Sequence, residues 1–250
     1  MPDDVPQVAL VDLDDTLITS SEGSRQAMAA VVNAICGDEA SEAHRRLDEA
    51  WARARSRYWR NENDARAGRF DPGSARRATL FSALRDCRLH VADMDGLLCL
   101  YAEVKRSAVR LADGAIDLLT ALHRSGAWVV LVTNGTSREQ RSKIARHGLA
   151  GLFQHIVIED EAGVGKPTLY LQARKLCGYP PTATCIVVGD DTGRDGRGAE
   201  LAGHRFWHVA PAGPCGYCSG RFDAAHVTSL RHVTSYIAAL PSGESRQGIG

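Results

Sequence analysis

The chain has 250 residues and a mass of 27.0 kDa, with 30 Lys and Arg balanced by 30 Asp and Glu. A net charge of zero argues against a general nucleic-acid binder, because such proteins carry a strong basic excess. Hydrophobic residues make up 44% and charged residues 24%, which are ordinary values for a globular protein with a buried core. Only four of the 30 basic residues are lysines, so a mechanism that needs a lysine has few candidates.

The sequence predicts a soluble, cytoplasmic protein without a membrane partner. The N-terminal segment shows neither a basic region nor an apolar stretch typical of a secretory signal. No apolar run approaches the roughly 18 residues of a membrane span. The seven cysteines are an odd, scattered set, which favours reduced thiols over a disulfide framework.

Five short apolar runs rich in β-branched residues predict the strands of a parallel sheet. They cover residues 8–12, 128–133, 155–158, 185–189 and 206–209. The clearest runs are continuous rather than alternating, as expected for strands buried on both faces. Helical patterns at 115–122, 137–147 and 169–177 separate the later strands, each followed by a glycine. Strands and helices that alternate in this way predict an α/β fold with a doubly wound parallel sheet.

The interval after the first strand is too long for one crossover connection. Residues 19–110 contain no convincing strand, and helices are expected at about 22–36, 41–60, 73–88 and 96–110. We therefore predict a core of residues 1–18 and 111–240 that carries an all-helical insertion of residues 19–110. Residues 241–250 are predicted to be a frayed end.

The first strand ends in closely spaced carboxylates, at Asp12-Leu13-Asp14-Asp15-Thr16. Catalytic groups in an open α/β sheet collect beyond the carboxyl ends of its strands. Asp12 and Asp14 can face one crevice, where like charges are costly unless a cation or a proton compensates them. An ordinary acidic turn is the structural alternative.

Two later strand ends also carry polar groups. Thr133-Asn134-Gly135 combines a hydroxyl, an amide and a flexible backbone before a helix, which suits an anion, although Asn-Gly is also a common turn. Asp190, Asp191 and Asp195 place three carboxylates near a strand end, a set of oxygen ligands that suits Mg²⁺.

A lysine precedes the helix at 169–177, in Gly165-Lys166-Pro167, where its ammonium group could reach a phosphate oxygen. The other lysines, Lys105, Lys143 and Lys175, are predicted to be solvated residues on helices.

In this order and spacing the segments resemble the four motifs of the haloacid dehalogenase-like (HAD) superfamily of hydrolases. Asp12 to Thr16 is similar to the first motif and Thr133-Asn134 to the second. Lys166 stands at the place of the third-motif lysine, and Asp190 with Asp195, followed by Gly198-Ala199, is similar to the fourth. The resemblance implies a Rossmann-like core with the helical insertion as a mobile cap.

The resemblance implies hydrolysis of a small phosphate monoester. Asp12 would be the nucleophile that forms an aspartyl-phosphate. Asp14 would protonate the leaving alkoxide and then deprotonate the attacking water. Thr133, the backbone at Asn134, and Lys166 would hold the phosphoryl oxygens.

Mg²⁺ is the cofactor that the resemblance implies. It would be held by Asp12, the main-chain carbonyl of Asp14 and Asp190, with Asp191 or Asp195 assisting directly or through water. The ion would offset the repulsion between carboxylate and phosphate. The expected partner is a small phosphorylated metabolite. The sequence does not decide whether the protein also forms a homodimer.

Alternatives within the superfamily are a phosphotransferase or mutase and a dehalogenase. Dehalogenases lack the second acidic residue of the first motif, so Asp14 favours phosphoryl transfer. Phosphonatases use a cap lysine, and residues 17–104 contain none. Mutases of the β-phosphoglucomutase type use a histidine soon after the first motif, and residues 17–43 contain none.

Two residues depart from the family pattern: Thr168 follows Pro167 where an aspartate is usual, and Asp191 replaces a common serine. Neither departure removes a catalytic group.

A protein that keeps the fold but only binds a ligand is the alternative from another class, and the intact Asp12 and Lys166 argue against it.

The residues of the helical insertion do not identify the substrate. Residues 41–88 hold twelve arginines against seven acidic residues, which could attract an anion but is more often a solvated helix face. Trp51, Tyr58 and Trp59 could stack on a base or a sugar, although aromatic residues at such spacing are more often core.

Cys215-Gly-Tyr-Cys218 is a single CxxC motif with four histidines near it, namely His204, His208, His226 and His232. Such a group could bind Zn²⁺, but the second ligand pair is irregular. Incidental cysteines in a loop are therefore the simpler expectation.

Overall fold

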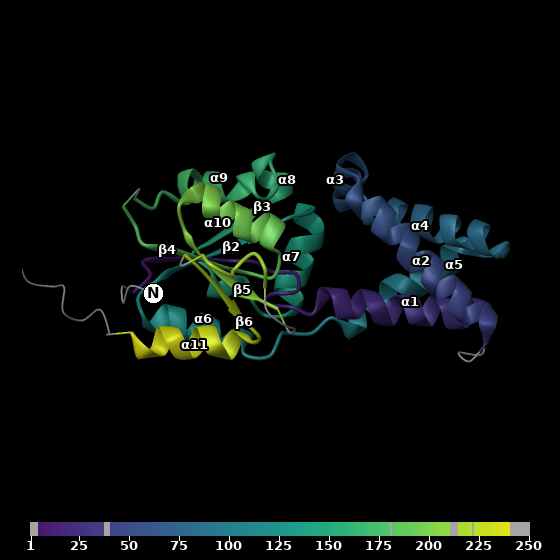
Figure 1. The fold of residues 1–250 in the computed structure, drawn as a ribbon, viewed down its shortest axis with the longest axis horizontal. Coiled ribbons are helices and arrows are strands. Elements are labelled where there is room, and N and C mark those ends of the chain that lie inside the picture. The colour runs from purple at the N-terminus through teal and green to yellow at the C-terminus, as the bar shows by residue number, and fades with distance from the viewer. Residues whose placement is uncertain (1–4, 38–40, 181, 211–214, 222, 241–250) are drawn as a thin grey trace, which may run out of the picture. The chain divides into compact units, whose positions relative to one another are not determined.

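Six parallel strands form one sheet in the order β3-β2-β1-β4-β5-β6 (Figure 1). They are β1 (Val8–Val11), β2 (Trp128–Thr133), β3 (His155–Ile158), β4 (Cys185–Gly189), β5 (Arg205–Val209) and β6 (Ala224–Val227). The computed structural model describes residues 5–37, 41–180, 182–210, 215–221 and 223–240, so the predicted frayed end lies outside the described residues. The strand order reverses at β1, which brings the carboxyl ends of β1, β2 and β4 together.

The continuous apolar runs are explained by the position of their strands. β1 lies at the centre of the sheet, where Val8 pairs with Trp128 of β2 on one side and with Cys185 of β4 on the other. All residues of β1 and β4 are buried. A strand covered on both faces has no polar side, so its apolar run is continuous. The predicted α/β fold with a doubly wound parallel sheet is confirmed.

Helices cover both faces of this sheet. Figure 1 shows α8, α9 and α10 on one face and α6 and α11 on the other. The helices and short turns of this part are α6 (Ala115–Arg124), α7 (Ser137–Arg146), η1 (Ala150–Leu152), α8 (Glu159–Ala162), α9 (Thr168–Cys177), η2 (Thr192–Gly196), α10 (Arg197–Ala202) and α11 (Leu230–Ala239). Val8 and Leu10 of β1 pack with Tyr170 of α9 and Ala199 of α10 in one buried cluster.

Three elements near the C-terminus were not predicted from the sequence: α10, β6 and α11. The run Ala-Ala-His-Val of β6 is too short and too weakly apolar to predict a strand by itself. Its pairing with β5 stabilises the extended conformation that its composition alone does not favour, and Trp207 of β5 aligns with Ala225 of β6. β6 is therefore an edge strand defined by its neighbour.

The chain divides into two compact units. Met1–Thr19 with Leu111–Gly250 contains the sheet and is called the core unit, and Ser20–Arg110 is called the helical unit. The helical unit contains α1 (Ser20–Cys36), α2 (Glu42–Arg60), α3 (Glu62–Phe70), α4 (Pro72–Cys87) and α5 (Met94–Ala108). Among the described residues, no helix combines the length and the apolar character of a membrane span.

The helical unit has its own hydrophobic core. Trp51 of α2 is 1% exposed, donates from Nε1 to Thr79 Oγ1 of α4 over 3.2 Å, and lies against Tyr101 of α5. The unpredicted helix α3 begins at Asn61, whose side chain accepts a hydrogen bond from the backbone of Asp64. Such a cap lets a short polar segment form a helix.

Candidate active site

Asp12 lies directly after β1, 5% exposed, and its amide donates to the carbonyl of Val188 over 2.9 Å. This bond extends the pairing of β1 with β4 beyond the strand, so Asp12 and the residues after β4 share one edge. Carboxylate oxygens of Asp12, Asp190 and Asp195 lie within 4.8 Å of one another. Three of the predicted site residues are therefore brought together by the ends of two neighbouring strands.

Asp195 belongs to the short π-helical turn η2 and is 1% exposed. Its Oδ1 accepts from Tyr170 Oη over 2.9 Å, and its Oδ2 accepts from the amide of Asp191 over 3.2 Å. A Cβ on Gly189 would lie 2.2 Å from Asp195 Oδ2. Only glycine at the end of β4 leaves room for this carboxylate to reach the cluster.

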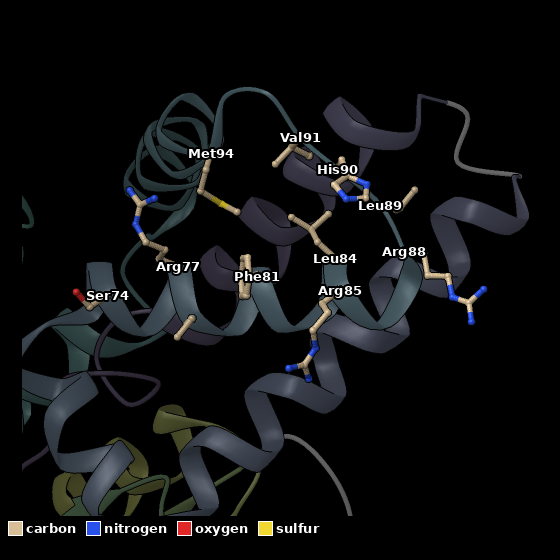
Figure 2. A pocket seen from close by; sticks show the side chains of 11 residues that line it. Ser74, Arg77, Phe81, Leu84, Arg85, Arg88, Leu89, His90, Val91 and Met94 are labelled. Atoms are coloured by element: carbon tan, nitrogen blue, oxygen red, sulfur yellow. The ribbon is translucent and has the colours of Figure 1, made fainter.

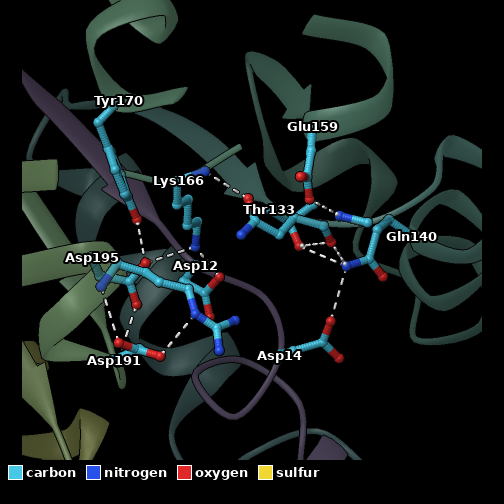
Figure 3. A network of polar contacts seen from close by, with 12 residues as sticks. Asp12, Asp14, Thr133, Gln140, Glu159, Lys166, Tyr170, Asp191 and Asp195 are labelled. Carbon is cyan, nitrogen blue, oxygen red and sulfur yellow. Dashed lines mark hydrogen bonds and ion pairs between the residues drawn. The ribbon is translucent and has the colours of Figure 1, made fainter. Parts of the chain in front are cut away.

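Lys166 is the cation of the cluster. Its side chain is 3% exposed, and its Nζ donates to Asp12 Oδ1 and, over 2.7 Å, to Asp195 Oδ1 (Figure 3). Burial lowers the pKa of Lys166, but Asp12 and Asp195 outweigh this effect and raise it. The ammonium group therefore stays charged between two carboxylates.

One ammonium does not balance three carboxylates. Burial raises the pKa of Asp12 to about 7, against the lowering effect of Lys166 and with a further rise from Asp195. Burial, with repulsion from Asp12 and Asp195, raises the pKa of Asp190 to about 8. The cluster thus lacks positive charge, which is the condition under which a divalent cation or protons are taken up.

Asp14 lies apart from this cluster and contacts a different lysine. Its Oδ1 and Oδ2 each lie 2.9 Å from Lys143 Nζ, and its Oδ2 also accepts from Gln140 Nε2 over 2.9 Å. Lys143 is 8% exposed, so the expectation that it is a solvated helix residue is wrong. It is buried because α7 turns this face toward the end of β1.

The chain reverses just after Asp14. Asp15 has a left-handed backbone with φ of 66°, and its amide donates to the carbonyl of Ile18 over 2.7 Å. Aspartate tolerates this conformation better than most residues. The chain therefore turns directly after the two carboxylates. Thr16 Oγ1 is buried without a hydrogen-bond partner among the described residues.

The end of β2 is held by side chains from two other segments. Thr133 is 1% exposed, and its Oγ1 accepts from Gln140 Nε2 over 2.8 Å. Asn134 Oδ1 accepts from the amide of Lys166 over 2.9 Å, and Glu159 Oε2 accepts from the amide of Gly135 over 2.9 Å. Asn134 therefore positions the loop that carries Lys166.

Asp191 has a local role in the structure. Its Oδ1 accepts from the amides of Gly193 and Arg194 over 2.8 and 3.0 Å, and its Oδ2 lies 3.0 Å from Arg194 Nε. Of the two residues left open as assistants of the metal, Asp195 is the one whose carboxylate lies with Asp12. Asp191 caps the turn that carries Asp195.

Sequence reasoning missed four residues that shape this site: Gln140, Lys143, Glu159 and Tyr170. Two signals could have pointed to them. Gln140 and Lys143 are three residues apart on α7, so they share one helix face. Glu159 directly follows β3 at the same edge of the sheet as Asp12.

A separate pocket of about 920 Å³ lies within the helical unit. Figure 2 shows Phe81, Leu84 and Met94 at its apolar wall, with Arg77 and Arg85 beside them. Phe81 as a whole residue is 61% exposed. No predicted site residue lines this pocket, so it is not part of the cluster at the strand ends.

A model of the haloacid dehalogenase-like hydrolase family matches residues 6–203. Because the match covers well over half of the chain, the protein belongs to this family of hydrolases. The four motifs and the six-stranded parallel sheet agree with this assignment.

Several relatives are phosphatases. The chain is 29% identical over 205 residues to a glyceraldehyde 3-phosphate phosphatase of Methanopyrus kandleri, covering 79% of this chain and 81% of that protein. It is 40% identical over 90 residues to a phosphoserine phosphatase of Thermus thermophilus, a match that spans only 35% of each protein. The magnesium-bound HAD-hydrolase YfnB of Bacillus subtilis has a TM-score of 0.70 at 20% identity, covering 94% of this chain and 99% of that chain, and so shares the fold.

Proposed function

We propose that the protein is a Mg²⁺-dependent phosphatase that hydrolyses a small phosphate monoester through an aspartyl-phosphate on Asp12. The observation that carries the proposal is the buried group of Asp12, Asp190 and Asp195 around Lys166 at the strand ends. Membership of the hydrolase family and the phosphatase relatives support it.

The chemistry of the donors fits Mg²⁺. Three carboxylates with one buried lysine leave a negative excess, and all of the available donors are oxygens, which Mg²⁺ prefers over soft ligands. Asp12, Asp190 and the main-chain carbonyl of Asp14 would hold the ion, with Asp195 directly or through water. When bound, it supplies positive charge against the phosphoryl oxygens.

Asp12 is the proposed nucleophile. One carboxylate oxygen forms a bond to phosphorus while the bond between phosphorus and the ester oxygen breaks. A water molecule then attacks phosphorus, which releases inorganic phosphate and restores the Asp12 carboxylate. Lys166, already hydrogen-bonded to Asp12, is placed to donate to a phosphoryl oxygen beside it.

Asp14 is the proposed proton carrier. In the acid step it gives a proton to the leaving alkoxide, and in the second step it takes one from the attacking water. Lys143 and Gln140 hold the ionised carboxylate in place, which is the form that the base step requires. The acid step requires a protonated Asp14 and therefore a weaker contact with Lys143.

Thr133 and the backbone at Asn134, together with Lys166, form the proposed phosphate cradle. Thr133 Oγ1 and the backbone after β2 lie at the N-terminal end of α7, where amides favour an anion. Gln140 and Glu159 fix this loop by hydrogen bonds to Thr133 and Gly135. These bonds support a loop that is ordered before any phosphate binds.

The helical unit is the proposed cap, and two arginines of α2 pair with acidic residues of the same helix. Arg45 lies 2.5 Å from Glu42 and 3.2 Å from Glu49 on the exposed face of α2, and Arg53 also pairs with Glu49. Such pairs are typical of a solvated helix surface. The substrate is therefore proposed only as a small phosphorylated metabolite.

Hydrolysis of an aryl phosphate tests the function. Release of inorganic phosphate is expected with Mg²⁺, and loss of release is expected after chelation with EDTA, with recovery on adding Mg²⁺ back. A panel of phosphorylated sugars, short acids and nucleotides then ranks substrates by kcat/KM. Binding of these monoesters without turnover would instead favour a ligand-binding protein. Halide release from 2-haloacids, or isomerised phosphates without free phosphate, would favour a dehalogenase or a mutase.

A further inference from the structure

The CxxC segment forms a tight turn in the core unit. The carbonyl of Cys215 accepts from the amides of Cys218 and Ser219 over 3.1 and 3.0 Å. Tyr217 anchors the turn, because its ring lies edge-on to Phe206 at 6.1 Å between centroids. Both cysteines are free thiols, and their Sγ atoms lie within 4.8 Å of each other. The turn therefore presents two sulfur atoms at one place.

A buried imidazole completes a group of three. His208 on β5 is 8% exposed, and ligand atoms of His208, Cys215 and Cys218 all lie within 4.8 Å of one another. Tetrahedral zinc with bonds of about 2.0–2.3 Å places its ligand atoms roughly 3.3–3.8 Å apart. Small side-chain movements thus suffice to enclose an ion.

His208 uses Nε2 for a backbone carbonyl and turns Nδ1 toward His226. His208 Nε2 lies 2.9 Å from the carbonyl oxygen of Asp190, which can only accept, so Nε2 carries the proton. His208 Nδ1 of the neutral ring then has a lone pair. An N–H held by a backbone carbonyl is the usual support of a metal-binding histidine.

A second imidazole lies against the first. His226 Nδ1 on β6 is 3.1 Å from His208 Nδ1, a spacing close to that of two ligands on one tetrahedral ion. His226 Nε2 is buried and has no hydrogen-bond partner among the described residues. His226 is not in the group whose ligand atoms all lie within 4.8 Å of one another, so its ring has to move toward the cysteines to reach an ion there.

We propose that Cys215, Cys218 and His208 bind one Zn²⁺, with His226 as the fourth ligand. Thiolate and imidazole select zinc over Mg²⁺, so this site and the carboxylate cluster take different metals. Ion binding releases the two thiol protons, and the proton that His226 Nδ1 donates to His208 Nδ1 moves to His226 Nε2, so both rings stay neutral. His208 also holds the carbonyl of Asp190, so zinc stiffens the loop that carries this aspartate.

Metal content of the full-length protein tests the site. We expect about one zinc per chain by mass spectrometry after dialysis against metal-free buffer. The double variant Cys215→Ser/Cys218→Ser and the single variant His208→Asn should fall to background, whereas His226→Asn should bind at least ~10-fold more weakly. Cys99→Ser, which removes an exposed thiol of the helical unit, is the matched control and should keep its zinc.

Two measurements keep the test independent of folding defects. Reduced, metal-free wild-type protein should bind Co²⁺ with thiolate-to-cobalt absorption, and added Zn²⁺ should raise its Tm. Asp12→Asn should keep its zinc, which separates this site from the carboxylate cluster. Zinc that persists in the double cysteine variant, wild-type protein without zinc affinity, or a Cys215–Cys218 disulfide in the freshly purified chain would each overturn the proposal. Unchanged zinc affinity in His226→Asn would show that His226 is not the fourth ligand.

Discussion

Asp12 and Asp14 lie two residues apart at the end of β1, yet each pairs with a different lysine in different surroundings. The Asp12 and Lys166 side chains are 8% and 3% exposed, whereas those of Asp14 and Lys143 are 30% and 10% exposed. Lys166 donates to Asp195 as well as to Asp12, and Asp14 accepts a hydrogen bond from Gln140 as well as from Lys143.

This difference matches the two chemical roles proposed for the pair. A nucleophile gains from a dry, preorganised setting in which charge is fixed. A proton carrier must exchange protons with the leaving group and with water, which a more open position allows. The partners that tertiary packing brings to each carboxylate, rather than the spacing of the two residues, separate the roles.

The largest effect is expected from Asp12→Asn. An amide cannot form the covalent intermediate, so turnover of an aryl phosphate should fall at least about 10⁴-fold while the protein stays folded. Phosphate release and the melting temperature are the measurements. Asp15→Asn is the matched control, because asparagine also tolerates a left-handed backbone, and near-normal turnover is expected. Equal rates in Asp12→Asn and the wild type would sink the covalent mechanism.

Lys166→Met should affect both activity and stability. It removes the buried cation between Asp12 and Asp195, which is expected to cost about 3–5 kcal/mol in free energy of unfolding. Turnover should fall about 10²–10³-fold because one donor to the phosphoryl group is lost. Urea denaturation and kinetics measure the two effects. If stability were unchanged, the ion pairs around Lys166 would not hold the cluster together.

Asp14→Asn distinguishes the two carboxylates by their dependence on the leaving group. Turnover of an alkyl phosphate should fall about 10²–10⁴-fold, because the alkoxide then lacks its proton. An aryl phosphate has a better leaving group, so its loss should be smaller. Comparing kcat for the two esters measures the difference. A loss of the same size for both would contradict the role of Asp14 as general acid.

Lys143→Met is expected to have the smallest effect. It removes a contact that positions Asp14, so kcat should fall roughly 10-fold with little change in KM. Lys175→Met is the matched control, because Lys175 is exposed on α9 and should have no effect. The measurement is kcat and KM for an alkyl ester in both variants. A change in KM alone would place Lys143 in substrate binding instead.

Much of the core was predictable because its signals are local. A continuous apolar run implies a strand covered on both faces, and this pattern identified β1 and β4. β6 and α3 were missed because pairing in one case and capping in the other supply what their composition lacks. Local signals therefore define the centre of the sheet better than its edge.

The sequence by itself determined the parallel sheet, the helical insertion and the polar residues at the strand ends. Each of these follows from short-range patterns in which a few neighbouring residues carry the information. The reversal of strand order at β1 then brings Asp12 to Asp190 and Asp195.

Only the tertiary structure decided which lysine pairs with which aspartate. Lys143 and Asp14 are 129 positions apart, and Lys166 and Asp12 are 154 apart. No local pattern specifies such pairs, because they depend on how α7 and the loop before α9 pack over the sheet. The same reason applies to His208 beside Cys215 and Cys218, where a strand and a separate turn meet.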